Sequence, residues 1–118
     1  MSFTFHSALQ THAVVYAIAG RIGHDDETTA LLADLSAALE KHIPYVLMDL
    51  SALEYITSSG LNFFIRVLTR TRNAAGELIL CGLHGEVEKL FALSKLNEIF
   101  TIYPSIEQGL AKINAQQA

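Results

Sequence analysis

YVLMDLSALEYITSSG, residues 45–60, and the segment Leu61–Asn73 that follows it decide the fold of this chain. The run Tyr45–Leu50 is apolar without alternation, which is typical of a strand buried on both faces of a mainly parallel sheet. Residues 51–56 are interpreted as a connector with two apolar anchors. One face of a helix is indicated by the i, i+3, i+4, i+7 spacing of Leu61, Phe64, Ile65 and Leu68.

Three hydroxyl residues and a glycine, Thr57-Ser58-Ser59-Gly60, lie where the connector enters this helix. Any one of the hydroxyls could cap the helix by accepting a backbone N–H, which is a purely structural interpretation. One hydroxyl suffices for a cap, however, so three favour a second role. The N-terminus of a helix also favours a phosphate, which would add about −1.5 to −2 charges at pH 7. The turn is therefore either a simple cap or a phosphorylation switch that a docked partner would sense.

The other segments predict strands and helices that alternate along the chain. Phe3–Leu9 alternates in polarity and Ala13–Ala19 is apolar on both faces, so the short polar break between them indicates a hairpin. Gly20-Arg21-Ile22-Gly23 is expected to end the second strand. Downstream we expect a helix from Asp25-Asp26-Glu27 to about Lys41, a strand Glu77–Leu83, a helix Glu86–Leu93, a strand Ile99–Tyr103, and a last helix begun by Ser105 and Gln108, which are spaced as a capping box.

This order of elements predicts the fold class. Strands that alternate with helices imply a mainly parallel sheet with right-handed crossovers. We expect a single α/β domain over residues 1–118, in which an N-terminal β-hairpin is followed by β-α repeats that form a mixed, mainly parallel sheet with about four helices. Two cores would not fit in 118 residues, and a composition that is 51% apolar suffices for one.

Composition and charge exclude several functions. The formal net charge of −4 lacks the basic footprint of a nucleic-acid binder. No apolar run approaches the ~20 residues of a membrane span, and the N-terminus has no signal-peptide pattern. We therefore expect a cytoplasmic protein that neither binds nucleic acid nor inserts into a membrane.

The sequence offers few candidates for catalysis or metal binding. Cys81 has no second cysteine to pair with and is expected to be a small buried strand residue. The stretch Ile56–Gly60 does not meet the G-x-S-x-G pattern of a nucleophilic serine. Asp25, Asp26 and Glu27 are expected to cap a helix rather than hold a metal. The five histidines are scattered without metal-ligand spacing: His6, His12, His24, His42 and His84. We expect no enzyme, no metal and no cofactor.

The outward side of the segment Leu61–Asn73 suggests a docking face. Advancing 100° per residue from Leu61 places Phe63, Arg66 and Arg70 near the opposite face, with Val67 at the flank. An exposed aromatic beside two arginines is the composition of interface anchors. The alternative is that another helix covers Phe63.

Three stretches together resemble the STAS domain of bacterial anti-sigma-factor antagonists: Asp49-Leu50-Ser51, Ile56-Thr57-Ser58-Ser59-Gly60-Leu61, and LSKLNEIFTIY at residues 93–103. The resemblance covers essentially the whole chain. It implies a STAS-like fold without enzymatic activity that works as a switch. In that family the unmodified domain binds an anti-sigma-factor serine kinase and releases the sigma factor. The kinase then phosphorylates a serine of the turn, and a metal-dependent serine phosphatase removes the phosphate.

The resemblance also implies particular site residues. The family's acceptor stands directly before the glycine, which here is Ser59, with Ser58 and Thr57 as alternatives. Thr57 stands where the family turn often has an aspartate, a departure that bears on phosphorylation more than on the fold. Partner-binding residues are then expected in the turn and on the helix: Thr57, Ser58, Ser59, Gly60, Phe63, Arg66, Val67 and Arg70.

Two other functions remain open from the sequence. STAS-like domains also occur as constitutive accessory subunits of membrane transporters, where they bind an ATPase or scaffold partner without phosphorylation. In that case Phe63 would be the docking residue. A small-molecule site or an enzyme at the ends of the parallel strands is the third possibility, and no residue can be named for it.

Overall fold

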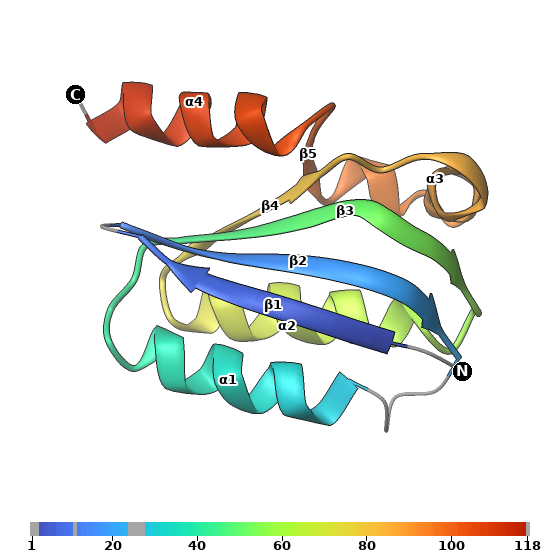
Figure 1. The fold of residues 1–118 in the computed structure, drawn as a ribbon, viewed down its shortest axis with the longest axis horizontal. Helices are drawn as coiled ribbons and strands as arrows, with labels where there is room; N and C mark the ends of the chain where they lie inside the picture. Colours follow the sequence, from blue (N-terminus) through green and yellow to red (C-terminus); the bar gives the residue numbers. More distant parts are fainter. Residues whose placement is uncertain (1–2, 11, 24–27, 118) are drawn as a thin grey trace.

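The computed structural model describes residues 3–10, 12–23 and 28–117. Its sheet has the order β1-β2-β3-β4-β5, in which β1 pairs with β2 in antiparallel fashion and every other neighbouring pair is parallel. The predicted mixed sheet with an N-terminal hairpin is confirmed (Figure 1). The elements are β1 (Phe3–Leu9), β2 (Ala13–Ile22), α1 (Thr29–Leu39), β3 (Tyr45–Ile56), α2 (Leu61–Asn73), β4 (Glu77–Cys81), α3 (Gly85–Leu93), the 3-10 helix η2 (Leu96–Glu98), β5 (Thr101–Tyr103) and α4 (Ile106–Gln117).

Helices cover both faces of the sheet. The helices α1 and α2 lie side by side on one face, and α4 lies on the other (Figure 1). The larger core cluster lies on the α1–α2 side, and a chain of ring contacts links α2 to α3: the Phe63 and Phe64 centroids are 5.0 Å apart, and Phe64 and Phe91 are 5.3 Å apart. This contact fixes α3 beside the end of β3, which positions the site described below.

The long central strand corrects the interpretation of residues 51–56 as a connector. These residues continue β3, since β2 also runs on past Gly20 and pairs with them, for example at Ile22 and Ile56. For the same reason β2 extends past the expected bound at Ala19 and ends at Ile22, within the stretch Gly20–Gly23 that was expected to end it. Gly20 adopts a φ of 98°, and the register shifts beside it, so the two strands pass an irregularity instead of separating.

Other boundaries differ by a few residues. Helix α1 ends at Leu39 rather than near Lys41, and His42 takes a positive φ in the turn that follows. The caps expected at Asp25, Asp26 and Glu27 lie outside the described residues, as does His24. Strand β4 ends at Cys81 rather than Leu83, and β5 begins at Thr101 rather than Ile99.

Helix α2 has the predicted bounds, and Leu61, Phe64 and Leu68 of the predicted face are buried, but the buried surface extends to the other side of the helix. Phe63 and Val67 are fully buried, whereas Ile65, which was expected in the core, is 40% exposed. The helix is covered by the sheet, by α1, and at Phe63 by the ring of Phe3, whose centroid lies 6.2 Å away. The predicted outward aromatic is therefore wrong, and the ring that lies against Phe63 belongs to strand β1 instead of the helix named in the alternative.

The last helix packs closely on the sheet. Gly109 of α4 lies so near β4 that a Cβ there would stand 2.7 Å from the Cys81 Sγ. Cys81 is fully buried, as predicted, and burial raises the pKa of its thiol to about 12, with smaller contributions from Asp49 and Glu107. Half of the predicted capping box is present, because the Gln108 N–H donates to Ser105 Oγ at 3.2 Å.

Candidate functional site

The turn between β3 and α2 is held in place by Thr57. The Thr57 hydroxyl donates a hydrogen bond to the Gly23 carbonyl at 2.9 Å and accepts one from the Gly60 N–H at 3.1 Å. Its backbone N–H donates to the Ile22 carbonyl at 3.1 Å. Among the three hydroxyl residues, Thr57 is therefore the one whose side chain holds the turn that leads into α2, and its hydroxyl acts as both donor and acceptor.

Ser58 and Ser59 contribute their backbones to the turn and leave their side chains outside it. Their carbonyls accept from the Leu61 and Asn62 N–H groups at 3.2 and 3.1 Å, which leads the chain into α2. Both side chains are exposed, and within the described part of the chain neither hydroxyl has a hydrogen-bond partner. The hydroxyls of the two serines are thus accessible, and they form no hydrogen bond that stabilises the described part of the fold.

Gly60 is required here for space. A Cβ at this position would lie 3.0 Å from the Ile22 carbonyl oxygen and 3.2 Å from side-chain carbons of Ile22 and Ile56. Since the φ of Gly60 is −65°, the requirement is steric, not conformational. The turn consequently sits tightly against the end of β2.

A groove of about 450 Å³ runs between this turn and α3. Its apolar part includes the most exposed large apolar side chain among the described residues, Leu93 at 82%, and Tyr55 at 40%. The Arg21 guanidinium lies 5.0 Å from the centre of the Tyr55 ring. Helix α3 contributes the two charged side chains of the lining, and Lys89 Nζ lies 3.5 Å from Glu86 Oε1. The groove is lined by Tyr55, Ile56, Thr57, Ser58, Glu86, Lys89, Leu90 and Leu93.

The sequence analysis did not identify this groove, because its walls are about thirty residues apart in the chain. One signal was present. In the expected helix Glu86–Leu93, the spacing of Val87, Leu90 and Phe91 defines one packing side, and Leu93 falls outside it. An apolar residue on the polar side of a short helix indicates a contact with something outside the fold.

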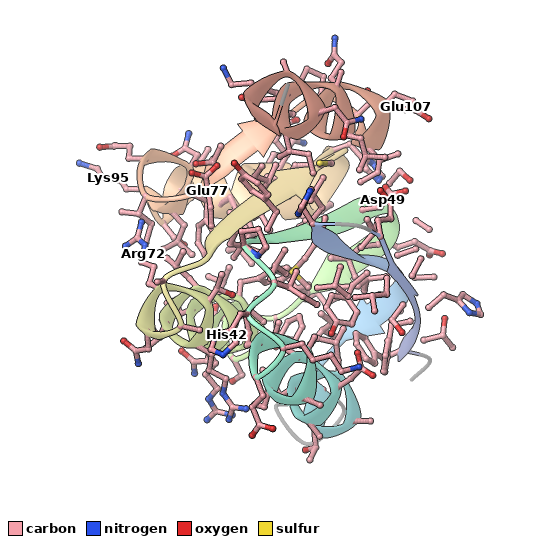
Figure 2. The ribbon with its side chains drawn as sticks, turned by 90° about the vertical axis from the view of Figure 1, so that its left-hand side faces the viewer. His42, Asp49, Arg72, Glu77, Lys95 and Glu107 are labelled. Atoms are coloured by element: carbon pink, nitrogen blue, oxygen red, sulfur yellow. The ribbon has the colours of Figure 1, made fainter. Side chains whose placement is uncertain are left out.

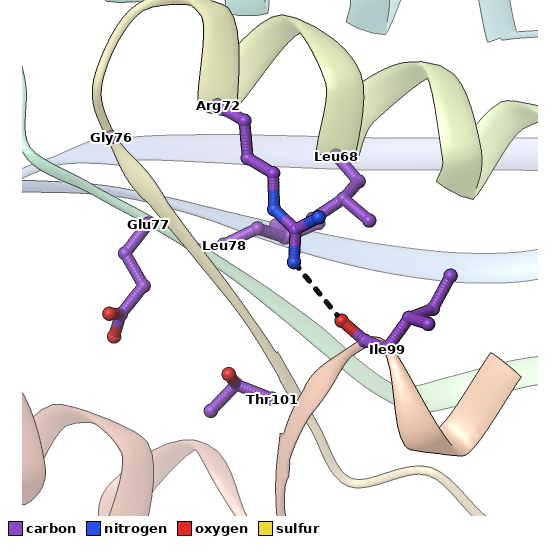
Figure 3. Close-up of a pocket in the computed structure, with 7 residues that line it drawn as sticks. All are labelled: Leu68, Arg72, Gly76, Glu77, Leu78, Ile99 and Thr101. Carbon is purple, nitrogen blue, oxygen red and sulfur yellow. Dashed lines mark hydrogen bonds between the residues drawn. The ribbon is translucent and has the colours of Figure 1, made fainter.

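A second pocket, of about 190 Å³, lies at the other end of α2 (Figure 3). Across it the Arg72 Nη2 donates to the Ile99 carbonyl at 3.4 Å, so the arginine joins α2 to the segment that leads into β5. Figure 2 places Arg72, Glu77 and Lys95 on one side of the molecule. The contact explains how the C-terminal end of α2 is fixed and gives no indication of a ligand.

The residues expected to form an outward docking face do not form one. Phe63 and Val67 are fully buried and cannot contact a partner at the surface. The Arg70 Nη1 donates to the Ser36 hydroxyl at 2.9 Å and to the Leu32 carbonyl at 3.3 Å, which ties α2 to α1. Arg66 is exposed. The predicted partner-binding residues are thus divided by burial: Ser58, Ser59, Arg66 and Arg70 are exposed, Thr57 is half-buried, and Gly60, Phe63 and Val67 are buried.

Within residues 3–10, 12–23 and 28–117, no three His, Cys, Asp or Glu side chains gather in a way that could hold a metal ion. No helix of this part combines the length and the apolar character needed to cross a membrane.

Comparison with known proteins identifies the family. Residues 8–109 match the family model of the STAS domain. This chain belongs to the STAS domain family. It is 37% identical, over 81 residues that cover 69% of this chain and 70% of the relative, to the putative anti-sigma factor antagonist BtrV of Bordetella bronchiseptica. The family resemblance found in the sequence is thereby confirmed.

Solved structures of anti-sigma factor antagonists have a fold similar to that of this chain. An anti-sigma factor antagonist from Mycobacterium paratuberculosis superimposes with a TM-score of 0.80 at 21% identity, covering 96% of this chain and 95% of the other. The anti-sigma factor antagonist SpoIIAA in its unphosphorylated form gives a TM-score of 0.79 at 19% identity, covering 95% and 97%. The phosphorylated form of the Bacillus SpoIIAA gives 0.70 at 18% identity, covering 95% and 99%.

Proposed function

We propose that this STAS protein is an anti-sigma-factor antagonist switched by phosphorylation of the pair Ser58–Ser59. The unmodified form binds an anti-sigma-factor serine kinase in the cytoplasm and so releases a sigma factor. The kinase transfers the γ-phosphoryl group of ATP to a serine hydroxyl oxygen, with release of ADP and of the hydroxyl proton, and the complex separates. A serine phosphatase restores the unmodified form. The domain itself catalyses nothing.

One observation carries the proposal: of the three hydroxyls in the turn, only that of Thr57 forms hydrogen bonds within the described chain, and both serines are exposed and unbonded there. A phosphate on either serine therefore breaks no hydrogen bond of the fold, whereas a phosphate on Thr57 would remove the O–H that donates to the Gly23 carbonyl. A dianion placed in a desolvated contact is costly. A hundredfold loss of affinity needs only ~2.7 kcal/mol.

The threonine at position 57 is compatible with this function. An aspartate at that position could accept the Gly60 N–H, and the Thr57 hydroxyl accepts it at 3.1 Å. The threonine also donates to the Gly23 carbonyl, which an ionised carboxylate could not do. The shape of the turn therefore does not depend on an acid. Support also comes from the relatives, since SpoIIAA has been solved in phosphorylated and unphosphorylated forms.

The test begins with peptide mapping of the protein purified from its own host under phosphatase inhibition. We expect one added phosphate, on Ser59 as the family resemblance implies or on its neighbour Ser58. Titration calorimetry with the anti-sigma-factor serine kinase of the same genome should then show at least a hundredfold weaker binding for the doubly substituted Ser58→Asp, Ser59→Asp protein.

The matched control is the protein with Ser58→Ala and Ser59→Ala, which should bind the kinase like wild type and accept no phosphate. Equal affinity of the aspartate and alanine proteins would contradict the switch. Absence of phosphate under every growth condition would favour a constitutive subunit instead. That alternative now lacks its docking residue, because Phe63 is buried.

A further inference from the structure

The two candidate serines differ in what they face. Ser58 lines the groove between the turn and α3, whereas Ser59 does not. The opposite wall of this groove carries Lys89 and Glu86 of α3. Ser58 thus has an ammonium group across the groove.

Lys89 is only weakly engaged in the unmodified protein. Its Nζ lies 3.5 Å from Glu86 Oε1, and the two side chains are 72% and 70% exposed. An exposed pair of this kind contributes little, with a median of about 0–1 kcal/mol. Glu86 and Lys89 are the charged groups that line the groove, and the Arg21 guanidinium lies 5.0 Å from the centre of the Tyr55 ring, which also lines it. A stronger anion on the facing wall would displace the carboxylate.

We propose that a phosphate on Ser58 is bound by the Lys89 ammonium across this groove, so that the phosphorylated protein closes its own groove. The inference rests on the proposed function and names the acceptor and its internal partner. The phosphate carries about −1.5 to −2 charges against −1 for Glu86, and it forms charge-assisted hydrogen bonds. The buried side chains of Val87 and Phe91 anchor α3 in the core, so the backbone that carries Lys89 is held in position.

Closure has a consequence for partner binding. The bridge joins the two walls between which Tyr55, Leu90 and Leu93 are accessible. A partner side chain seated against these residues would be excluded sterically, in addition to being repelled by charge. The switch would then act partly through shape.

The test needs no partner protein. Phosphoserine is incorporated at position 58 of the full chain by genetic encoding, and its second pKa, normally about 6, is measured by phosphorus NMR titration. Because a nearby cation favours the dianion, we expect this pKa to rise by several tenths of a unit in the Lys89→Gln variant. Lys112→Gln, which removes the same charge from α4, should leave it unchanged. Phosphoserine at position 59 should titrate alike with and without Lys89.

An identical pKa at position 58 in the wild-type and Lys89→Gln backgrounds would overturn the inference. So would an equal dependence on Lys89 at positions 58 and 59, because the groove would then not distinguish the serines. Neither result touches the proposed function, which is decided by phosphate mapping and kinase binding. Conversely, a protein that binds no anti-sigma factor would refute that function even where the titration behaves as expected.

Discussion

The two ends of α2 use their polar side chains in opposite ways. At the C-terminal end, Arg70 and Arg72 each donate to a neighbouring element, and the Thr71 hydroxyl donates to the Val67 carbonyl at 2.7 Å. At the N-terminal end, Ser58 and Ser59 present hydroxyls that bind nothing else in the described chain. One end of the helix therefore fixes the fold, and the other offers groups that can be modified without cost to it. Substitutions should separate the two ends.

The largest effect on the free energy of unfolding is expected from a substitution on the buried face of α2. Phe63→Ala removes a fully buried ring that contacts Phe3 and Phe64, and it should lower the free energy of unfolding by about 3–5 kcal/mol. Ile65→Ala, on the exposed side of the same helix, is the matched control and should change it by less than about 1 kcal/mol. Urea unfolding measures both. Similar losses for the two variants would show that the burial of α2 is misassigned.

Alkaline pH should also destabilise the packed interior. Burial raises the pKa of Cys81 from 9.0 to about 12, and burial together with the 2.6 Å hydrogen bond to Asp34 raises the pKa of Tyr16 above 10.0. Both groups stay protonated in the folded state while the unfolded chain deprotonates. Stability is thus fully present below pH 9 and falls as the pH rises, by up to about 1.4 kcal/mol per pH unit for each group.

Urea unfolding at about pH 8 and about pH 10.5 would measure this loss. A Cys81→Ala variant, less stable at every pH, should show a shallower decline because one of the two groups is gone. A decline as steep as that of wild type would mean that Cys81 does not take part.

A smaller effect is expected at the cap. Thr57→Ala removes the acceptor for the Gly60 N–H and the donor to the Gly23 carbonyl, at a cost of about 0.5–2 kcal/mol. Thr57→Asp keeps the acceptor alone and should lie between alanine and wild type. Thermal unfolding of the three proteins gives the order. If aspartate equalled alanine, the Gly60 contact would contribute nothing.

The smallest effect should come from the serines. Ser58→Ala and Ser59→Ala should each change the free energy of unfolding by no more than about 0.5 kcal/mol, because neither hydroxyl is bonded within the described chain. The same chemical unfolding assay applies. A clearly larger loss for either variant would break the contrast between the two ends of α2.

Much of the fold could be predicted from local pattern, and the errors have identifiable causes. The buried run Tyr45–Leu50 and the bounds of α2 followed directly from periodicity. The second half of β3 was missed because its buried residues, Leu53 and Ile56, are three apart instead of two. The strand passes register shifts there, and these destroy the alternation on which the prediction depends.

The position of the site in the chain was predictable, but the separate roles of its three hydroxyl residues were not. Three adjacent hydroxyls marked the turn, but they are equivalent in sequence, and only the Gly23 carbonyl, 34 residues away, distinguishes Thr57 from the serines. Advancing 100° per residue from Leu61 placed Phe63 on the solvent side, because that reasoning assumes a single buried face. Helix α2 is covered on more than one side. The choice of Ser59 over Ser58 came from family resemblance and stays a prediction.

The double hydrogen bond of Thr57 also bears on the kinetics of recognition. The two hydrogen bonds of the Thr57 hydroxyl and the close contact of Gly60 with Ile22 hold the loop in one conformation before a partner binds. A protein that recognises the two serines then pays no entropy for ordering them. Preorganisation of this kind permits near rigid-body docking, so that association depends on collision and orientation, not on a rare loop conformation.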